Sequence, residues 1–233
     1  MNTEIESYNW LGAMRHTFEN GQLTFGPGAF SIDKKIGSDL DGEGHEIERV
    51  VFEGNSTTRI YQDAFFNCKS LLLIDGLDRQ PLIEIGQYAF AECYSLVAFQ
   101  FPETLKRIER HAFDSCISLS GVQFKEGLEE IGSYAFNDCR ALGWSIYDKQ
   151  NGRRGTLHLP STLKKINSCA FWGCLSLDVI EVPKDCFVDG AVGAHNGVME
   201  FLKIGYTYRT EGDGFDEIPT NFSSPIWVKI KRY

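Results

Sequence analysis

Apolar and small residues recur along the middle of the chain in a pattern that repeats five times. The segments are DAFFNCKSL, YAFAECYSL, HAFDSCISL, YAFNDCRAL and CAFWGCLSL, and their Ala-Phe pairs are 25, 23, 23 and 35 residues apart. An isoleucine precedes each alanine by four residues and a cysteine follows it by four. This spacing places the three residues on one face of a short helix or helical turn. The phenylalanines are Phe65, Phe90, Phe113, Phe136 and Phe171, and the cysteines are Cys68, Cys93, Cys116, Cys139 and Cys174.

The hydrophobic period changes after the leucine that ends each segment. VAFQFP, SGVQF, TLHLP and DVIEVP alternate apolar and polar residues, which predicts a short strand with one buried side. A turn and a strand that repeat every 23 residues are too short to bury their own apolar side. Stacked neighbours bury a continuous core, so the pattern predicts a solenoid.

The segment LPSTLKKINSCAFWGCLSLDVIEVP closely resembles the leucine-rich repeat of BspA-like proteins, also called the Treponema pallidum type. The resemblance covers residues 47–186. It implies a right-handed α/β solenoid with a parallel sheet on the concave side and short helices or turns on the convex side. It also implies a binding role, because members of this family are mostly described as surface or secreted adhesion proteins.

The cysteines at one phase of five repeats are predicted to form a ladder inside the stack. A free cysteine behaves as a small apolar residue and is often buried. The chain has seven cysteines, so complete internal pairing is impossible. We therefore expect five reduced thiols with a packing role. Cys169 stands outside this phase, in a position that faces outward.

Both ends of the chain depart from the repeat. Residues 1–46 are predicted to form an N-terminal cap, in which QLTFGPGAFSI supplies a strand pair around a Gly-Pro-Gly turn. Residues 187–233 contain two alternating segments, MEFLKIGYTYRT and PIWVKIKRY, and are predicted to cover the last coil as strands. The final KIKRY is read as a solvated tail. The caps and the repeats together make one structural domain.

The 35-residue interval contains an insertion, GWSIYDKQNGRRG, at residues 143–155. It precedes the strand of its coil, and insertions in repeats often form loops on the binding side. Trp, Tyr and Arg are enriched at interface hot spots. The loop is either a recognition element or a surface loop whose aromatic residues pack back on the solenoid. Its candidate binding residues are Trp144, Tyr147, Arg153 and Arg154.

Composition narrows the class of partner. The formal net charge is −9 and the pI is near 5.1, which argues against a nucleic-acid ligand. No segment has the roughly 20 apolar residues of a membrane span. The first residues lack a signal-peptide pattern, so we expect a cytoplasmic protein, or a secreted or cell-surface protein if a leader was removed. The five histidines lack metal-site spacing and nothing assembles a nucleophile with a base, so we expect no metal, cofactor or enzymatic activity.

The sequence therefore predicts a monomeric, non-enzymatic module that binds a protein or peptide through its concave face and the insertion. Two alternatives stay open: an adhesin that binds host protein or glycan outside the cell, and an intracellular inhibitor or immunity-type protein. The outward positions of the predicted concave strands supply the remaining candidate binding residues. These are Asp75, Gln100, Gln123, His158 and Glu181.

Overall fold

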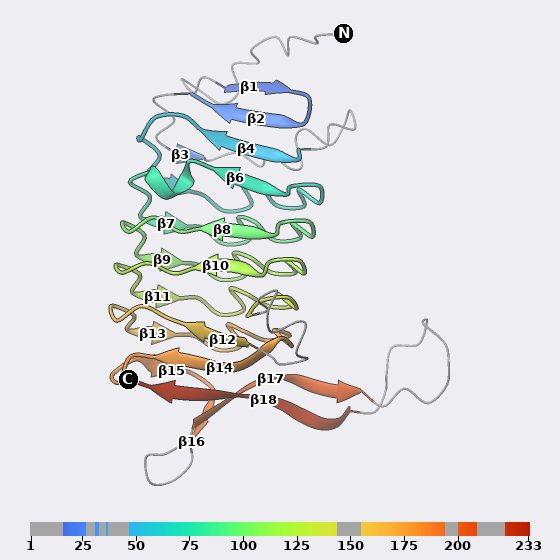
Figure 1. The fold of residues 1–233 in the computed structure, drawn as a ribbon, viewed down its shortest axis with the longest axis vertical. Coiled ribbons are helices and arrows are strands. Elements are labelled where there is room, and N and C mark those ends of the chain that lie inside the picture. Colours follow the sequence, from blue (N-terminus) through green and yellow to red (C-terminus); the bar gives the residue numbers. More distant parts are fainter. Residues whose placement is uncertain are drawn as a thin grey trace.

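Each repeat forms one coil that contains a longer strand and a two-residue strand (Figure 1). The computed structural model describes residues 16–26, 31–32, 36, 47–143, 155–193, 200–208 and 222–233. The longer strands are β2 (Gln22–Phe25), β4 (Arg49–Phe52), β6 (Leu73–Asp75), β8 (Ala98–Gln100), β10 (Gly121–Gln123), β12 (Gly155–His158) and β14 (Leu177–Val182). The two-residue strands are β3 (Ser31–Ile32), β5 (Arg59–Ile60), β7 (Glu84–Ile85), β9 (Arg107–Ile108), β11 (Glu130–Ile131), β13 (Lys165–Ile166) and β15 (Phe187–Val188).

Both sets of strands stack in parallel along the long axis of the molecule (Figure 1). The two-residue strands form one continuous seven-stranded sheet from β3 to β15. The longer strands pair as β2–β4–β6, β8–β10 and β12–β14, with equivalent residues side by side. The predicted leucine-rich-repeat solenoid is confirmed. We call the outward surface of β4, β6, β8, β10, β12 and β14 the long-strand face.

The segment predicted as a helical face is instead a strand followed by a turn. Each isoleucine lies in a two-residue strand, whereas the Ala-Phe pair and the cysteine lie in turns. The backbone N–H of Phe90 donates to the carbonyl of Ala112 in the next coil, and that of Phe113 donates to Ala135. Alternate N–H groups of the turn therefore join coils, whereas an α-helix would use all of them for its own carbonyls.

Two residues of every turn adopt left-handed backbone conformations, which prevents a helix. The first is the residue before the alanine and the second follows the alanine by three positions. The first set has φ between 55° and 58° and comprises Asp63, Tyr88, His111, Tyr134 and Cys169. The second set comprises Asn67, Glu92, Ser115, Asp138 and Gly173. The rings of Tyr88, His111 and Tyr134 stack in parallel, with centroids 4.7 and 4.9 Å apart.

The core is a column of aromatic rings beside a column of thiols. The five repeat phenylalanines are fully buried, and neighbouring rings stack with centroids 5.0 to 5.6 Å apart. The five repeat cysteines are also buried. Four of these thiols donate to the phenylalanine carbonyl of the preceding coil, as Cys116 does to Phe90 at 3.1 Å. The stack therefore gives each of these four thiols a backbone carbonyl as its hydrogen-bond acceptor.

The parallel stack begins earlier than residue 47. β2 pairs in register with β4, and β3 pairs with β5, so residues within the predicted N-terminal cap already form a coil. The expected strand pair around the Gly-Pro-Gly turn is wrong, because β2 and β3 belong to different sheets. The hairpin joins β2 to β1 (His16–Glu19), through left-handed residues Asn20 and Gly21, a dipeptide typical of tight hairpin turns.

The C-terminal segment covers the last coil with antiparallel strands, as its alternation predicts. They are β16 (Ala191–Gly193), β17 (Glu200–Tyr208) and β18 (Phe222–Arg232). β18 also pairs in parallel with β14, from Val179 with Lys229 to Val182 with Arg232. The prediction of a solvated KIKRY tail is wrong: Arg232 Nη1 donates to the carbonyls of Lys184 and Cys186, and Tyr233 Oη donates to Leu159. β18 therefore extends the long-strand face by one strand.

Candidate binding surface

Two rows of outward side chains cross the long-strand face at right angles to the strands. Strand alternation places every second residue outside. Within the groups β4–β6, β8–β10 and β12–β14–β18, parallel pairing in register places equivalent residues about 4.8 Å apart. The first row contains Arg49, Leu73, Ala98, Gly121, Thr156, Val179 and Lys229. The second row contains Val51, Asp75, Gln100, Gln123, His158, Glu181 and Lys231.

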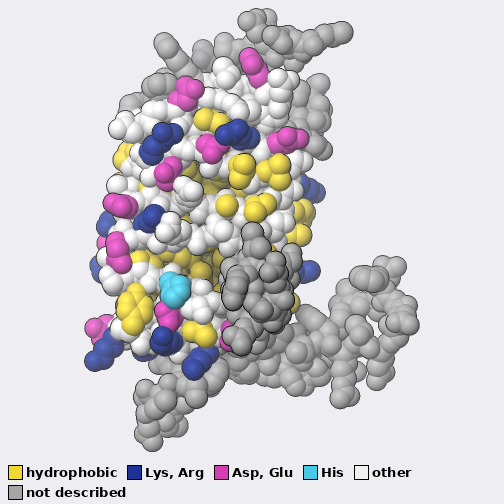
Figure 2. Space-filling view, in the orientation of Figure 1, with side chains coloured by type: hydrophobic (Ala, Val, Ile, Leu, Met, Phe, Trp, Pro, Cys, Tyr) yellow, Lys and Arg dark blue, Asp and Glu magenta, His cyan; other side chains and the backbone are white. Residues whose placement is uncertain are grey.

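An apolar cluster lies at the β6–β8 end of this face (Figure 2). Leu72, Leu73 and Val97 are 43%, 46% and 45% exposed. Next to them, Arg49 Nε donates to Asp75 Oδ2 at 2.5 Å. Asp75 thus holds an ion pair at the rim of the cluster.

Small and uncharged residues occupy the β8–β10 pair at the centre of the face. Gln100 and Gln123 are exposed neighbours in the β8–β10 pair. In the adjacent row Gly121 lies beside Ala98, and a Cβ added to Gly121 would stand 3.1 Å from the Cβ of Ala98. A partner can therefore approach the backbone closely here, with two amide side chains available for hydrogen bonds.

A charged cluster lies at the β12–β14–β18 end. Glu181 accepts from Lys231 Nζ at 2.6 Å and lies 2.7 Å from His158 Nδ1. The hydrogen bond from Lys231 holds the pKa of Glu181 below its usual range. Burial opposes this shift, and His158 adds to it. Lys229 is exposed beside Val179. The sequence reasoning found His158 and Glu181 but missed both lysines, because they reach the face only through pairing of β18 with a strand 50 residues away.

The insertion residues Trp144, Tyr147, Arg153 and Arg154 lie outside the described residues. Its two ends are described and lie against each other. A Cβ on Gly155 would clash with the carbonyl of Gly143, so the backbones of these glycines are in contact. Gly155 is the first residue of β12, so the base of the insertion lies at the long-strand face.

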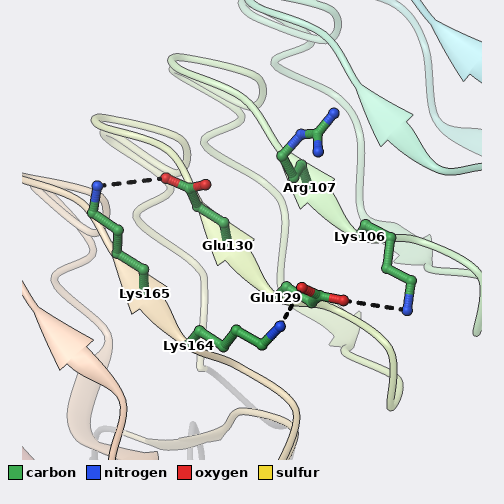
Figure 3. A pocket seen from close by; sticks show the side chains of 6 residues that line it. All are labelled: Lys106, Arg107, Glu129, Glu130, Lys164 and Lys165. Atoms are coloured by element: carbon green, nitrogen blue, oxygen red, sulfur yellow. Dashed lines mark hydrogen bonds and ion pairs between the residues drawn. The ribbon is translucent and has the colours of Figure 1, made fainter.

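A depression of about 380 Å³ lies on the two-residue strands. Lys106, Arg107, Glu129, Glu130, Lys164 and Lys165 line it (Figure 3). Its charges are paired across coils: Glu129 contacts Lys164 at 2.6 Å and Lys106 at 3.5 Å, and Glu130 contacts Lys165 at 3.7 Å. Arg107 pairs with Glu84 of the preceding coil in the same way. Because each of these side chains has an ion-pair partner in a neighbouring coil, we assign them to the stacking of coils and not to a ligand site.

The thiols differ in accessibility. Burial raises the pKa of Cys93, Cys116, Cys139 and Cys174, and it raises the pKa of Cys186 to about 11. Cys169 is half-buried and ends the column of outward residues that contains Tyr134. The thiols with raised pKa values stay protonated at neutral pH.

Within the described part of the chain, no cluster of three His, Cys, Asp or Glu residues could hold a metal ion. None of the helices described there has the length and hydrophobicity to cross a membrane.

Comparison with known families agrees with this architecture. The profile described as "BspA type Leucine rich repeat region" matches six copies, over residues 34–151 and 148–188. The chain belongs to the BspA-type leucine-rich-repeat family. No curated protein sequence matches the chain.

Solved structures of leucine-rich-repeat proteins are similar to this one. A leucine-rich-repeat protein from T. pallidum has a TM-score of 0.51 and 23% identity, over 76% of this chain and 78% of that chain. A leucine-rich-repeat protein from Bacteroides ovatus has a TM-score of 0.44 and 20% identity, over 76% and 54%. A leucine-rich cell surface protein from Faecalibacterium prausnitzii has a TM-score of 0.34 and 17% identity, over 76% and 71%. At these identities the first likeness shows the fold alone.

Proposed function

We propose that this BspA-type solenoid is a non-enzymatic module that binds a protein partner through its long-strand face and the adjoining insertion. The observation that carries the proposal is the exposed cluster of Leu72, Leu73 and Val97. These side chains have no role in the core, which the repeat phenylalanines and cysteines fill. An exposed apolar cluster rimmed by polar residues is typical of a protein-interaction site.

The rest of the face supports the same function. Gln100 and Gln123 offer donors and acceptors without the desolvation cost of charges, next to a backbone that Gly121 leaves accessible. A solenoid holds these groups at fixed spacing, so the partner meets a preformed surface and the chain loses little conformational entropy on binding. We include the insertion because its base adjoins β12.

Site-specific photocrosslinking tests the proposal directly. A photoreactive phenylalanine analogue placed at Gln123 should crosslink a partner protein in cells or extract, and mass spectrometry should identify it. The matched control carries the analogue at Gln62, which is exposed beside the two-residue strand β5. Crosslinks to the same proteins from both sites, or from Gln62 alone, would contradict recognition by the long-strand face.

A further inference from the structure

The ladder of long strands is interrupted between β10 and β12. In the part of the chain that the structure describes, β10 pairs only with β8 and β12 pairs only with β14. The two strands lie in successive coils (Figure 1), and the two-residue strands of these coils, β11 and β13, pair in register. The coils are therefore joined at the two-residue strands while their long strands stay unpaired. We call the facing edges of β10 and β12 the β10–β12 break.

Both edges of the break carry backbone groups at the spacing of a strand. Gly121 N–H donates to the coil of β8, so the backbone groups of the next residue, Val122, face the break. Leu159 N–H donates to β14, so the backbone groups of His158 face the break from the other side. Among the described residues, no backbone hydrogen bond uses the N–H or C=O of Val122 or His158. These groups are positioned to pair with a further strand.

The break also uncovers apolar side chains of the core beside β10. Val122 and Phe124 point inward but are only partly buried. The equivalent residues one coil earlier, Phe99 and Phe101, are each 2% exposed, because β10 and Phe124 pack against them. An unpaired strand edge beside accessible apolar side chains is the arrangement that accepts an added strand.

Contacts at both ends of the break limit the length of such a strand. Before β10, the N–H of Ala141 donates to the carbonyl of Ile117 and joins the two coils. After β10, the carboxylate of Glu126 accepts from the N–H groups of Ser161 and Thr162, at 3.1 and 3.3 Å. Residues 118–125 lie between these contacts and set an upper limit of about eight residues, since paired strands match residue for residue.

The strands β6 and β8 are also unpaired, but their edge is shorter. Val97 N–H donates to the carbonyl of Leu72, which occupies the first acceptor on the β6 side. The chain then turns at Gly76, which has a left-handed φ of 78° and precedes the 3₁₀ turn η3 (Leu77–Arg79). Ile74 alone is left to present its backbone groups toward β8. The edge of β10 is therefore the longer of the two.

We propose that the β10 edge of the break binds an extended segment of the partner protein as an added strand. The backbone of the segment pairs with Val122, and an apolar side chain packs against Val122 and Phe124. This inference rests on the proposed function and adds the mode of recognition. Main-chain hydrogen bonds hold the segment, and alternate side chains that point inward give the apolar preference.

Amide hydrogen exchange of the unbound chain, resolved by residue with NMR, tests whether the edge is open. The N–H of Val122 should exchange at least about tenfold faster than that of Phe99, its equivalent in β8, whose backbone faces the paired strand β10. Similar protection of the two amides would show that the chain closes its own edge, and it would overturn the inference.

The probe for the bound state is a library of capped heptapeptides, varied at every position and selected for binding to the full chain. Selected peptides should carry large apolar residues at alternate positions. N-methylation of each residue in turn should lower affinity by about tenfold at alternate residues and little at those between, because every second N–H of an added strand faces β10. An even effect along the peptide, or no selection, overturns the inference.

Protein variants then locate the added strand. Val122→Lys places an inward charge at the edge, which opposes strand addition, and should weaken the selected peptides at least about tenfold. Ile74→Lys is the matched control, because Ile74 is also partly buried and lies in the same inward row on β6. Equal losses in the two variants overturn the assignment to β10. Circular dichroism checks the fold, and serine replaces lysine at both positions if either variant misfolds.

The outcomes separate this inference from the proposed function. If strand addition is overturned and Gln123 still crosslinks a specific partner, the long-strand face binds that partner through side chains and the proposed function stands. If the peptides pair with β10 as expected and Gln123 crosslinks no specific protein, strand addition stands and the proposed function fails.

Discussion

At the scale of the residue, Phe113 shows how one repeat position contributes to the stack. Its ring is fully buried, lies parallel to Phe90 and Phe136, and meets Phe99 edge-on with centroids 4.8 Å apart. Its backbone N–H and carbonyl also join neighbouring coils. The side chain therefore contributes both apolar burial and contacts with two coils at once.

Replacing Phe113 by Ala should lower the free energy of unfolding by about 3–5 kcal/mol, as expected when a packed aromatic side chain leaves a cavity. Denaturant titration measures this value. Phe187→Ala is the control, because Phe187 is 59% exposed and should cost less than about 0.5 kcal/mol. A loss below about 1 kcal/mol for Phe113→Ala would mean that the ring column does not hold the coils together.

The buried thiols predict a reactivity order. Cys93, Cys116, Cys139 and Cys174 are fully buried with raised pKa values, whereas Cys169 is half-buried. Since the thiolate is the reactive form, Cys169 should react with iodoacetamide much faster than the other four. Peptide mapping of briefly alkylated native protein measures the order. Equal labelling of Cys116 and Cys169 would contradict the assigned core.

The same thiols predict a loss of stability in alkali. Their pKa is raised by folding, so the unfolded chain releases these protons near pH 8.5 while the folded chain keeps them. Unfolding therefore becomes easier as pH rises above that value, by about 1.4 kcal/mol per pH unit for each thiol. Unfolding titrations at pH 7.0, 9.0 and 10.0 measure the slope, and Cys116→Ala should reduce it by one proton. An unchanged slope in that variant would show that Cys116 ionises equally in both states.

At the scale of the element, the two-residue strands carry a row of alternating charge. Pairing in register brings together Arg59, Glu84, Arg107, Glu130 and Lys165 in that order. Arg107 contacts Glu84 at 2.5 Å, and this contact raises the pKa of Arg107. Each coil thus meets opposite charges on both sides, which favours this order of stacking over a displaced one.

Glu130→Lys places a third positive charge between Arg107 and Lys165. Like charges directly opposite each other in a sheet destabilise it, so the variant should lose about 1–2 kcal/mol over its two neighbours, less at high salt. Glu103→Lys is the matched control, since Glu103 is exposed in a loop. Urea titration at 50 and 500 mM salt measures both. An equal effect of the two changes would show that the row has no role in stacking.

The sequence predicted correctly the elements whose apolar pattern repeats in every coil. The Phe-Cys phase and the strand alternation located the core and the long-strand face, because burial repeats with each coil. The Ile, Ala and Cys residues do not lie on a helix as predicted. Left-handed residues such as Tyr88 and Glu92 direct alternate N–H groups of the turn to carbonyls of the next coil. A sequence signal for positive φ was available at Gly173 and, more weakly, at Asn67 and Asp138, whereas residues such as Tyr88 and Glu92 have no such preference.

The features that could not be predicted from the sequence depend on contacts between segments far apart in the chain. β2 and β3 build a coil without the Ala-Phe-Cys pattern, and only the phase of Phe25 and Ile36, both buried, hinted at it. Lys231 joins the candidate site because β18 pairs with β14. No local pattern specifies that pairing, so the lysines of the charged cluster were not predictable.

At the scale of the whole molecule, the two ends of the insertion meet at the stack. The contact between Gly143 and Gly155 means that the coil closes without the residues between them. Replacing residues 144–154 by two glycines should therefore keep the chain folded and change the melting temperature by only a few degrees, because closure entropy depends weakly on loop length. Differential scanning calorimetry measures this. Loss of the folding transition would show that the insertion is part of the core.

The insertion also carries a binding prediction. If it contributes to recognition as proposed, Trp144→Ala and an Arg153/Arg154 double alanine variant should weaken partner binding by about 2 kcal/mol, with little change in melting temperature. Titration calorimetry with the crosslinked partner measures the loss. Unchanged affinity in both variants would remove the insertion from the site.

The central claim is that the long-strand face is the surface that binds a protein partner. The most direct test is the affinity of the crosslinked partner for a Gln100→Arg/Gln123→Arg double variant, which blocks the centre of the face without touching the core. The control is Gln62→Arg, at an exposed residue next to β5 in the sheet of two-residue strands. The double variant should lose at least about tenfold in affinity at an unchanged melting temperature, and Gln62→Arg should bind normally. Equal affinity for the double variant and the parent chain would contradict the claim.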